Sequence, residues 1–432
     1  MWTVGLRVVF INNHNHGIII NMIYDLAIIG GGPAGLMAAS RAGELGARVI
    51  IIEKNKQPGV KLLLTGNGRC NLTNKTDNHK ILASYYGNNG KFLLSGFSKF
   101  DAKSTIDFFK QRGVKTKIED NNRVLPQSDQ ARDILEALLS DLKKYQVEIK
   151  TNSAVAKLIV QNNKIQKIIL TSGEEILAQN YLLATGGKSY PLTGSTGEAY
   201  SWLQKLGHTI IEPRPALTPI ILQEKFIRSL EGLSFKDVSL SAKQNDRLLA
   251  KETADIIFTS NGISGPATIN LSRLITEQSI NNTVINIDFF PLKTEKQLDS
   301  DFRQAWQAQK NKTLKNSFVG LLPSKLINII LELTKIDPDK QVNSVTREER
   351  RALVLKLKEF PVSIKKLEGY DKAIITKGGV KINEVDPKTM RSKIIDNLYL
   401  AGEILDLDGP SGGFNLQICW TTGYVAGENA AK

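Results

Sequence analysis

The feature that most constrains the fold is the stretch from Tyr24 to Glu53. Three glycines, Gly30, Gly32 and Gly35, follow the apolar run Leu26–Ile29 at the G-x-G-x-x-G spacing. In such a loop the first glycine turns the chain, the second lets the backbone approach a pyrophosphate, and the third packs a helix against a strand. The glycines alone would also fit a turn in an unrelated α/β domain, so the flanking residues decide between such a turn and a dinucleotide site.

The flanks complete a strand–helix–strand unit. A helix is expected over residues 33–45, and a second apolar run, VIII, ends in the acid Glu53. Unpaired N–H groups and the positive dipole end at a helix N-terminus favour an anion, and an acid after the second strand suits a ribose. We therefore predict a dinucleotide site, to which Pro33, Ala34 and Lys54 also belong.

Length and composition set the broad class. With 432 residues, 41% hydrophobic and 23% charged, the chain is expected to form two or three globular domains. No apolar run reaches the roughly 18 residues of a membrane helix. The two cysteines, Cys70 and Cys419, form no C-x-x-C pair, which fits a reducing cytoplasm. The spacing of the histidines implies no metal.

The net charge of +14 suits a polyanionic partner, which we favour on charge, and a lysine-rich composition bias is the alternative. Residues 293–366 hold 16 Lys or Arg against 9 Asp or Glu, a local charge of +7. This stretch is predicted to be helical, with a capping box at Thr346 and Glu349 that opens one helix. Whether the basic face meets RNA or only solvent stays open.

The order of patterns predicts a discontinuous α/β fold. An apolar run ending at Gly186 and Gly187 returns a strand to the parallel sheet, where open α/β sheets place ligands. The segment NLYLAGE, a second glycine turn (GPSGGFNLQ) and a final helix complete it near the C-terminus. The predicted domains are an extension at 1–21 that we expect to be disordered and functionally silent, a nucleotide-binding domain at 22–207, a β-barrel-like insert at 208–292, a basic helical insert at 293–360, and the return at 361–432.

Six segments together resemble the BaiN/YhiN-like flavoprotein family. They are GVKLLLTGNGRCNLTN, NRVLPQSD, ATGGKSYPLTGSTGEAY, FTSNGISGPATINLSR, ITKGGVKINEVDPKTMRSK and NLYLAGEILDLDGPSGGFNLQ. The resemblance covers the chain from about Ile23 to its end. It implies a Rossmann-like FAD-binding domain of the two-dinucleotide-binding flavoprotein type, discontinuous, with an inserted β-barrel and helical domain. There is no second G-x-G-x-x-G, so no built-in nicotinamide domain is expected.

The resemblance also assigns cofactor residues, from the adenosine to the flavin ring. It places Gly30, Gly32, Gly35 and Glu53 at the adenosine diphosphate, the Val155 backbone at the adenine, Thr185 and Gly186 at the pyrophosphate, Gly402 and Glu403 at the ribityl chain, and Gly412, Gly413, Asn415 and Leu416 at the ring. The chain departs from the usual pattern at Asn67, often glycine, and at Ser260, often histidine. The second departure weakens any catalytic role for the FTSNG turn.

The family that this chain resembles includes proteins with different activities, so more than one function is considered for this chain. One branch resembles ribosomal RNA dihydrouridine synthases, another reduces steroid enones of bile-acid intermediates, and an older label is aminoacetone oxidase. We expect an FAD-dependent reductase of a conjugated C=C bond that uses NAD(P)H, with a uridine of large-subunit ribosomal RNA as the favoured substrate. The alternatives are a small-molecule enone reductase and a flavin-binding protein that docks on ribosomes without catalysis.

The proton donor and the group that holds the substrate are expected in the loop 59–74. Cys70 is the candidate acid, and Arg69 beside it is placed to hold a carbonyl or to lower the thiol pKa. A buried structural thiol, with Arg69 on a phosphate, is the alternative. Tyr190, after the ATGG turn, is a second candidate acid.

Overall fold

The computed structural model of the chain describes residues 8–9, 21–275 and 277–432. Within the extension at 1–21, β1 (Val8–Val9) pairs with β2 (Asn21–Met22), and the rest of that predicted segment lies outside the described residues. The chain forms two compact units. The first runs to Arg214 and resumes at Ile375–Lys432, and the second is Pro215–Ile374.

A five-stranded parallel sheet forms the centre of the first unit. Its order is β21-β12-β3-β4-β8, so strands far apart in the sequence become neighbours. The strands are β3 (Tyr24–Ile29), β4 (Val49–Ile52), β8 (Glu148–Lys150), β12 (Ala178–Leu183) and β21 (Leu398–Leu400). All four residues of β4 and most of β3 are buried, as expected for a parallel sheet covered on both faces.

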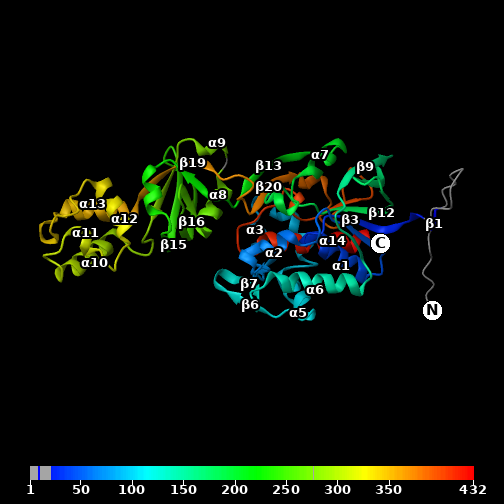
Figure 1. Cartoon of the computed structure of the whole chain (residues 1–432), viewed down its shortest axis with the longest axis horizontal. Coiled ribbons are helices and arrows are strands. Elements are labelled where there is room, and N and C mark those ends of the chain that lie inside the picture. Colours follow the sequence, from blue (N-terminus) through cyan, green and yellow to red (C-terminus); the bar gives the residue numbers. More distant parts are fainter. Residues whose placement is uncertain (1–7, 10–20, 276) are drawn as a thin grey trace. The chain divides into compact units, whose positions relative to one another are not determined.

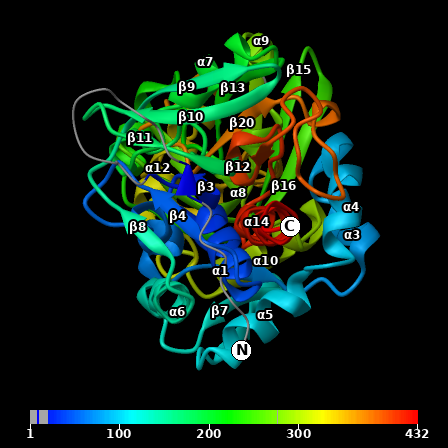
Figure 2. The same cartoon turned by 90° about the vertical axis from the view of Figure 1, so that its right-hand side faces the viewer.

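Two helices from opposite ends of the chain cover one face of this sheet. Figure 2 shows α1 (Pro33–Glu44) and α14 (Phe414–Ala430) side by side, with β9–β11 on the other face. Their backbones are in close contact, because a Cβ added at Gly423 would lie 2.4 Å from the Ala34 carbonyl oxygen. At Gly427 it would lie 2.3 Å from the Ala38 carbonyl oxygen. Glycines four residues apart share a helix face and permit this approach.

The remaining elements of the first unit surround this core. Two further three-stranded sheets are antiparallel, one of β9–β11 and one of β5–β7, and β13 pairs with β20. The strands are β5 (Thr73–Asn74), β6 (Thr116–Glu119), β7 (Arg123–Pro126), β9 (Val155–Gln161), β10 (Lys164–Leu170), β11 (Glu175–Ile176), β13 (Ile210–Ala216) and β20 (Ile375–Val380). The helices are α2 (Val60–Leu64), α3 (His79–Ser84), α4 (Leu94–Phe97), α5 (Ala102–Gln111), α6 (Ala131–Lys144) and α7 (Glu198–Lys205).

The second unit is a closed six-stranded barrel with helices (Figure 1). Its strand order is β14-β17-β16-β15-β18-β19. The strands are β14 (Ile220–Leu222), β15 (Ser234–Gln244), β16 (Arg247–Phe258), β17 (Gly262–Ser264), β18 (Thr283–Asp288) and β19 (Phe360–Leu367). The helices are α8 (Pro266–Leu274), α9 (Glu277–Ile280), α10 (Glu295–Gln307), α11 (Leu314–Ser317), α12 (Ser324–Thr334) and α13 (Arg347–Lys358).

The unit boundaries lie further along the chain than residues 207 and 360, where the sequence patterns placed them. β13 pairs with β20, so the first unit extends to Arg214. β19 pairs with β14 and β18 and closes the barrel, so the segment after 360 still belongs to the second unit. The predicted return to the first domain at 361 is therefore corrected to Ile375. The predicted capping box of α13 is present between Thr346 and Glu349.

Candidate functional site

The G-x-G-x-x-G loop joins β3 to α1, and two of its glycines are required by the fold itself. Gly30 has a φ of +104°, and a Cβ there would lie 2.5 Å from the carbonyl oxygen of Ala184, the residue that follows β12. At Gly35 an added Cβ would lie 2.0 Å from the Gly30 carbonyl oxygen. The first glycine therefore makes the turn and the third permits close helix–strand packing, as the pattern predicts.

Gly32 is different, because the described structure gives no internal reason for a glycine there. Its φ is −80°, which any residue adopts, and no described heavy atom lies within 4 Å of an added Cβ. Gly32 is the N-cap of α1, and no side chain caps the first turn among the described residues. Open space beside uncapped N–H groups fits a phosphate group.

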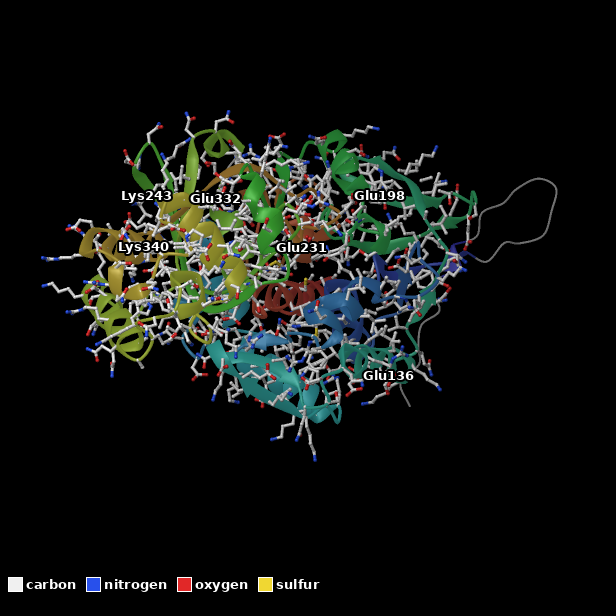
Figure 3. All side chains as sticks on the ribbon, turned by 60° about the vertical axis from the view of Figure 1, so that its left-hand side comes forward. Glu136, Glu198, Glu231, Lys243, Glu332 and Lys340 are labelled. Atoms are coloured by element: carbon white, nitrogen blue, oxygen red, sulfur yellow. The ribbon has the colours of Figure 1, made fainter. Side chains whose placement is uncertain are left out.

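Glu53 is buried, and backbone hydrogen bonds fix the orientation of its carboxylate. The residue is 7% exposed, and its two carboxylate oxygens each accept one backbone hydrogen bond of 2.8 Å, from the N–H of Gly31 and of Asn55. Each oxygen keeps a free lone pair for a ribose hydroxyl. Lys54 instead donates to Thr196 Oγ1 at 3.0 Å and to Glu198 Oε1 at 2.9 Å; Figure 3 labels Glu198.

Two buried polar atoms near these segments lack a protein partner within the described part of the chain. They are Thr185 Oγ1, two residues after the end of β12, and Asn71 Oδ1, directly after Cys70. A buried hydroxyl or amide oxygen without a hydrogen bond costs about 1–3 kcal/mol. A bound polar ligand that bonds to both atoms would remove this cost, so their presence fits a cofactor such as FAD.

Gly186 lies near Glu403 because the two residues follow neighbouring parallel strands, β12 and β21. Gly186 has a φ of +74°, and its added Cβ would lie 3.9 Å from Glu403 Oε2. Glu403 is held by a 2.8 Å salt bridge from Lys61 and a 2.7 Å hydrogen bond from the Thr376 N–H. Sequence patterns did not single out Lys61 or Thr376, because only the fold brings 61, 376 and 403 together.

The second glycine turn begins α14 and lies against the loop that contains Cys70. Gly413, the N-cap, has a φ of +101°, and its added Cβ would lie 2.3 Å from the carbonyl carbon of Thr73 on β5. Thr73 Oγ1 donates to Gln417 Oε1 on α14 at 2.5 Å. The Asn415 amide bonds to both backbone groups of Gly409 at 2.9 Å and so orders the turn.

Two of the predicted catalytic residues, Arg69 and Cys70, lie in the loop beside this turn, whereas Tyr190 lies in the segment after β12. Cys70 is 0% exposed, and burial raises the pKa of its thiol to about 12. Arg69 forms salt bridges to Glu119 at 2.5 Å and to Asp129 at 2.6 Å. Tyr190 is half-buried with a φ of +51° and precedes a short 3₁₀ turn. Their catalytic roles stay predictions, but the thiol is enclosed and the arginine already paired.

The other predicted cofactor residues adjoin the same segments. Ala34 packs at Gly402, whose added Cβ would lie 2.8 Å from the Ala34 Cβ. Pro33 is the first residue of α1, and Leu416 is 9% exposed in the first turn of α14. Val155 begins β9 and pairs with Leu170. These four assignments to FAD stay predictions.

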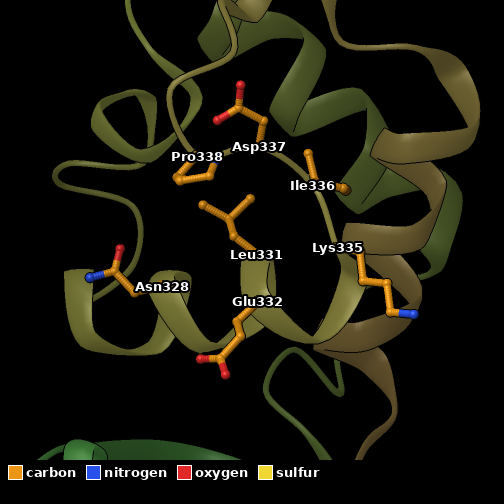
Figure 4. A pocket seen from close by; sticks show the side chains of 7 residues that line it. All are labelled: Asn328, Leu331, Glu332, Lys335, Ile336, Asp337 and Pro338. Carbon is orange, nitrogen blue, oxygen red and sulfur yellow. The ribbon is translucent and has the colours of Figure 1, made fainter.

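A pocket of about 470 Å³ in the second unit offers no comparable chemistry. It lies at the end of α12, and Figure 4 shows Leu331 and Pro338 at its centre, with Glu332 and Asp337 on opposite sides. Among the described residues no cluster of His, Cys, Asp or Glu is arranged to hold a metal ion. No described helix combines the length and the apolar character needed to cross a bilayer.

The fold and the glycine cradle define a Rossmann-type FAD-binding protein of the two-dinucleotide-binding flavoprotein class. The model described as "HI0933-like protein Rossmann domain" matches residues 24–429. The chain therefore belongs to the HI0933-like family, which consists of FAD-dependent oxidoreductases. This confirms the resemblance to the BaiN/YhiN-like flavoproteins and the predicted fold class.

Two curated relatives match over nearly their whole lengths. The chain is 32% identical to 3-dehydro-bile acid delta(4,6)-reductase of Clostridium scindens, over 94% of this chain and 99% of the relative. It is 28% identical to the ribosomal RNA dihydrouridine synthase of Escherichia coli, over 95% and 99%. Among solved structures, the 3-ketosteroid-Δ4-(5α)-dehydrogenase of Rhodococcus jostii shares the fold, with 16% identity, a TM-score of 0.50 and coverage of 95% and 97%.

Proposed function

We propose that the protein is a FAD-dependent reductase of a C=C bond conjugated to a carbonyl group, with a uridine of large-subunit ribosomal RNA as the preferred substrate. One observation carries the reaction class. The two curated relatives are named for different substrates, a bile acid and a ribosomal uridine, yet both names describe reduction of a carbonyl-conjugated double bond. The chain covers 99% of each relative, so the proposal concerns the whole protein.

The residues of the first unit fit FAD in named roles. The N–H groups at the start of α1 bind the pyrophosphate beside Gly32, and the fixed carboxylate of Glu53 accepts the ribose hydroxyls. Thr185 Oγ1 supplies a further hydrogen bond that it lacks within the protein. The N-terminus of α14 favours negative charge on the ring. When bound, the flavin supplies a hydride from N5, after reduction by NAD(P)H as a transient donor.

The preference for RNA rests on a basic surface of the second unit, which we define as Lys310, Lys312, Arg347 and Arg351. All four are exposed, and none forms a salt bridge within the described residues. Backbone hydrogen bonds from Val342 to the Lys312 carbonyl (3.1 Å) and from Asn343 to the Lys310 carbonyl (3.4 Å) bring the lysine loop beside the start of α13.

Neighbouring cations of the same segments are, by contrast, already neutralised. Lys340, labelled in Figure 3, contacts both oxygens of Glu349 at 2.7 and 2.8 Å, and Arg350 pairs with Asp299 at 2.5 Å. The unpaired cations are the ones that phosphate groups can bind with release of counterions. A target base would be unstacked and extruded to reach the flavin.

The second candidate is a small-molecule enone reductase, favoured by the 32% identity to the bile-acid enzyme. It predicts turnover of a steroid enone with NAD(P)H and no affinity for RNA. A flavin-binding protein that docks on ribosomes without catalysis predicts yellow protein whose reduced flavin no substrate reoxidises. The three candidates therefore differ in what reoxidises the reduced protein.

The deciding experiment maps dihydrouridine in large-subunit ribosomal RNA from cells with and without the gene. We expect one modified position to disappear and to return when purified protein and NAD(P)H are added to RNA from the deletion strain. Unchanged modification refutes the RNA substrate. Reoxidation by a 3-keto-4-ene bile acid, but not by RNA, then identifies the second candidate.

The basic surface has its own test. A plot of log K for RNA binding against log salt concentration has a negative slope. Replacing the four residues by Gln should reduce the magnitude of this slope by about 3, because each phosphate contact contributes about 0.7–0.9 to it. Replacing four exposed lysines of the first unit, Lys80, Lys91, Lys110 and Lys115, is the matched control and should leave the slope near its original value. Equal slopes for the two quadruple variants would contradict the assigned surface.

A further inference from the structure

Arg123 lies beside the second glycine turn, although 289 residues separate it from Gly412 in the sequence. It is the first residue of β7 and pairs with Asn74 on β5, whose side chain donates to the Gly412 carbonyl at 3.4 Å. A Cβ added at Gly412 would lie 3.5 Å from Arg123 Cγ and 3.8 Å from its Cδ. The stem of Arg123 therefore passes the turn that the proposed function gives to the flavin ring.

Three cations, Arg69, Lys117 and Arg123, surround only two carboxylates, Glu119 and Asp129. Arg69 contacts both carboxylates closely, at 2.5 Å to Glu119 and 2.6 Å to Asp129. Lys117 contacts Asp129 at 2.6 Å and Glu119 at 3.4 Å. The hydrogen bonds from Arg69 hold the pKa of Glu119 below its usual range, and those from Lys117 and Arg69 do the same for Asp129.

Arg123 is the cation left over from this arrangement. Its guanidinium makes two long contacts, 3.4 Å to Glu119 and 3.2 Å to the Asp120 carbonyl oxygen. Its side chain is 35% exposed. Guanidinium groups are always charged and carry five N–H donors, which suits them to an oxygen that gains negative charge. A small movement would exchange its long contacts for a ligand.

Reduction of a conjugated C=C bond needs such a donor. Hydride from reduced FAD adds to the β-carbon, and the π electrons of the C=C bond form a new bond between the α-carbon and the carbonyl carbon. The carbonyl π pair moves onto oxygen and gives an enolate. A proton then adds to the α-carbon and the carbonyl returns. The substrate gains two electrons and two hydrogens, and the flavin is oxidised. Charge on oxygen is largest at the transition state and in the enolate.

We propose that Arg123 is the residue that donates hydrogen bonds to this carbonyl oxygen. The inference rests on the proposed function and differs from the sequence-based prediction that Arg69 holds the carbonyl. Arg69 is engaged with two carboxylates, Glu119 and Asp129, and these salt bridges order the β6–β7 surface. The oxygen of a uracil and that of a 3-keto steroid gain the same charge. The role of Arg123 is therefore independent of which substrate class is correct.

The test compares Arg123→Gln and Arg123→Lys with Arg132→Gln as the matched control. Arg132, on α6, is 69% exposed, and its one salt bridge within the described residues is to Glu136, at 4.0 Å. In stopped-flow experiments the rate at which substrate reoxidises reduced protein should fall about 10²- to 10³-fold in Arg123→Gln and less in Arg123→Lys. Flavin content, flavin reduction by NAD(P)H and the control variant should remain at wild-type values.

A second readout does not depend on turnover. 4-Nitrophenol carries an oxygen whose charge mimics the enolate, and binding beside a guanidinium should lower its pKa. We expect the yellow phenolate band of the bound probe at lower pH with wild-type holoprotein than with Arg123→Gln. Equal phenol titrations and equal reoxidation rates would overturn the assignment while leaving the proposed function intact. If neither ribosomal RNA nor a steroid enone reoxidises the wild-type protein, the proposed function fails and the inference fails with it.

Discussion

The substitution Gly32→Ala separates what the fold requires from what a ligand requires. The backbone at Gly32 has a φ of −80°, and no described heavy atom lies within 4 Å of the new methyl group. Alanine therefore fits the protein without cofactor. The same methyl group occupies the space beside the first N–H groups of α1, where the pyrophosphate is proposed to bind. The variant should fold normally and lose FAD.

The expected changes in stability and in FAD affinity follow from the surroundings of Gly32 without and with the cofactor. Alanine at a compatible φ changes the free energy of unfolding by less than about 1 kcal/mol, since the loss of a glycine N-cap and the lower entropy of the unfolded chain offset each other. Loss of one charge-assisted hydrogen bond to a phosphate costs about 1.5–3 kcal/mol, which weakens FAD binding about 10- to 150-fold. Gly35→Ala is the contrast, because its methyl group would lie 2.0 Å from the Gly30 carbonyl oxygen.

The assay measures two quantities for each variant. Thermal unfolding of the protein freed of flavin reports stability, and quenching of flavin fluorescence reports the dissociation constant of FAD. We expect Gly32→Ala to match the wild-type melting temperature and to bind FAD weakly, whereas Gly35→Ala should lose about 3 kcal/mol of stability as well. A Gly32→Ala protein with wild-type affinity for FAD would refute the phosphate cradle.

Three further substitutions test other parts of the site. Gly413→Ala should lower both stability and flavin content, because its methyl group would lie 2.3 Å from the Thr73 carbonyl carbon at a φ of +101°; wild-type absorbance at 450 nm per protein would contradict this. Cys70→Ala should lose about 1 kcal/mol of stability and keep turnover within about twofold, since the thiol is buried; a loss near 100-fold would instead support the predicted role of Cys70 as the proton donor. Burial lowers the pKa of His208 below 6.5, so the unfolded chain binds the proton more readily. His208 thus contributes stability that is complete above pH 6.5 and is lost as the pH falls through its folded pKa. In denaturant titrations of His208→Asn, the free energy of unfolding should fall less steeply over this pH range than in the wild type, by at most about 1.4 kcal/mol per pH unit.

The parts of the fold that depend on neighbouring residues were predictable. Gly30, Gly35 and the helix that begins at Pro33 belong to a single β–α–β unit, so the spacing of the glycines alone indicates the turn and the packing. The capping box of Thr346 and Glu349 spans four residues and was predicted for the same reason. The order of the patterns predicted the discontinuous domain and the barrel-like insert, and the resemblance to a known family implied the same organisation. The net charge of residues 293–366 could be counted from the sequence. Which of these cations remain without a salt bridge could not be predicted, because the pairing depends on the fold.

Contacts across hundreds of residues were not predictable from sequence. The Lys61–Glu403 salt bridge and the approach of Arg123 to Gly412 exist only because separate strands and loops meet in the fold. The boundary at residue 361 failed because β19 resembles any half-buried strand, and only its pairing with β14 and β18 assigns it to the barrel. Asn415, expected at the flavin ring, has its amide engaged with Gly409 and Pro410.

The last helix explains why a site split between the two ends of the chain forms as one structure. α14 contacts the loop that contains Cys70 through hydrogen bonds from Thr73 to Gln417 and from the Trp420 indole to the Leu72 carbonyl oxygen at 2.8 Å. One turn further, Gly423 brings its backbone against α1. The helix therefore fixes the glycine turn at its own N-terminus relative to the nucleotide loop at the start of α1. Because these contacts are backbone approaches and buried hydrogen bonds, the two halves of the site have little freedom to separate, and a single cofactor can bind across both.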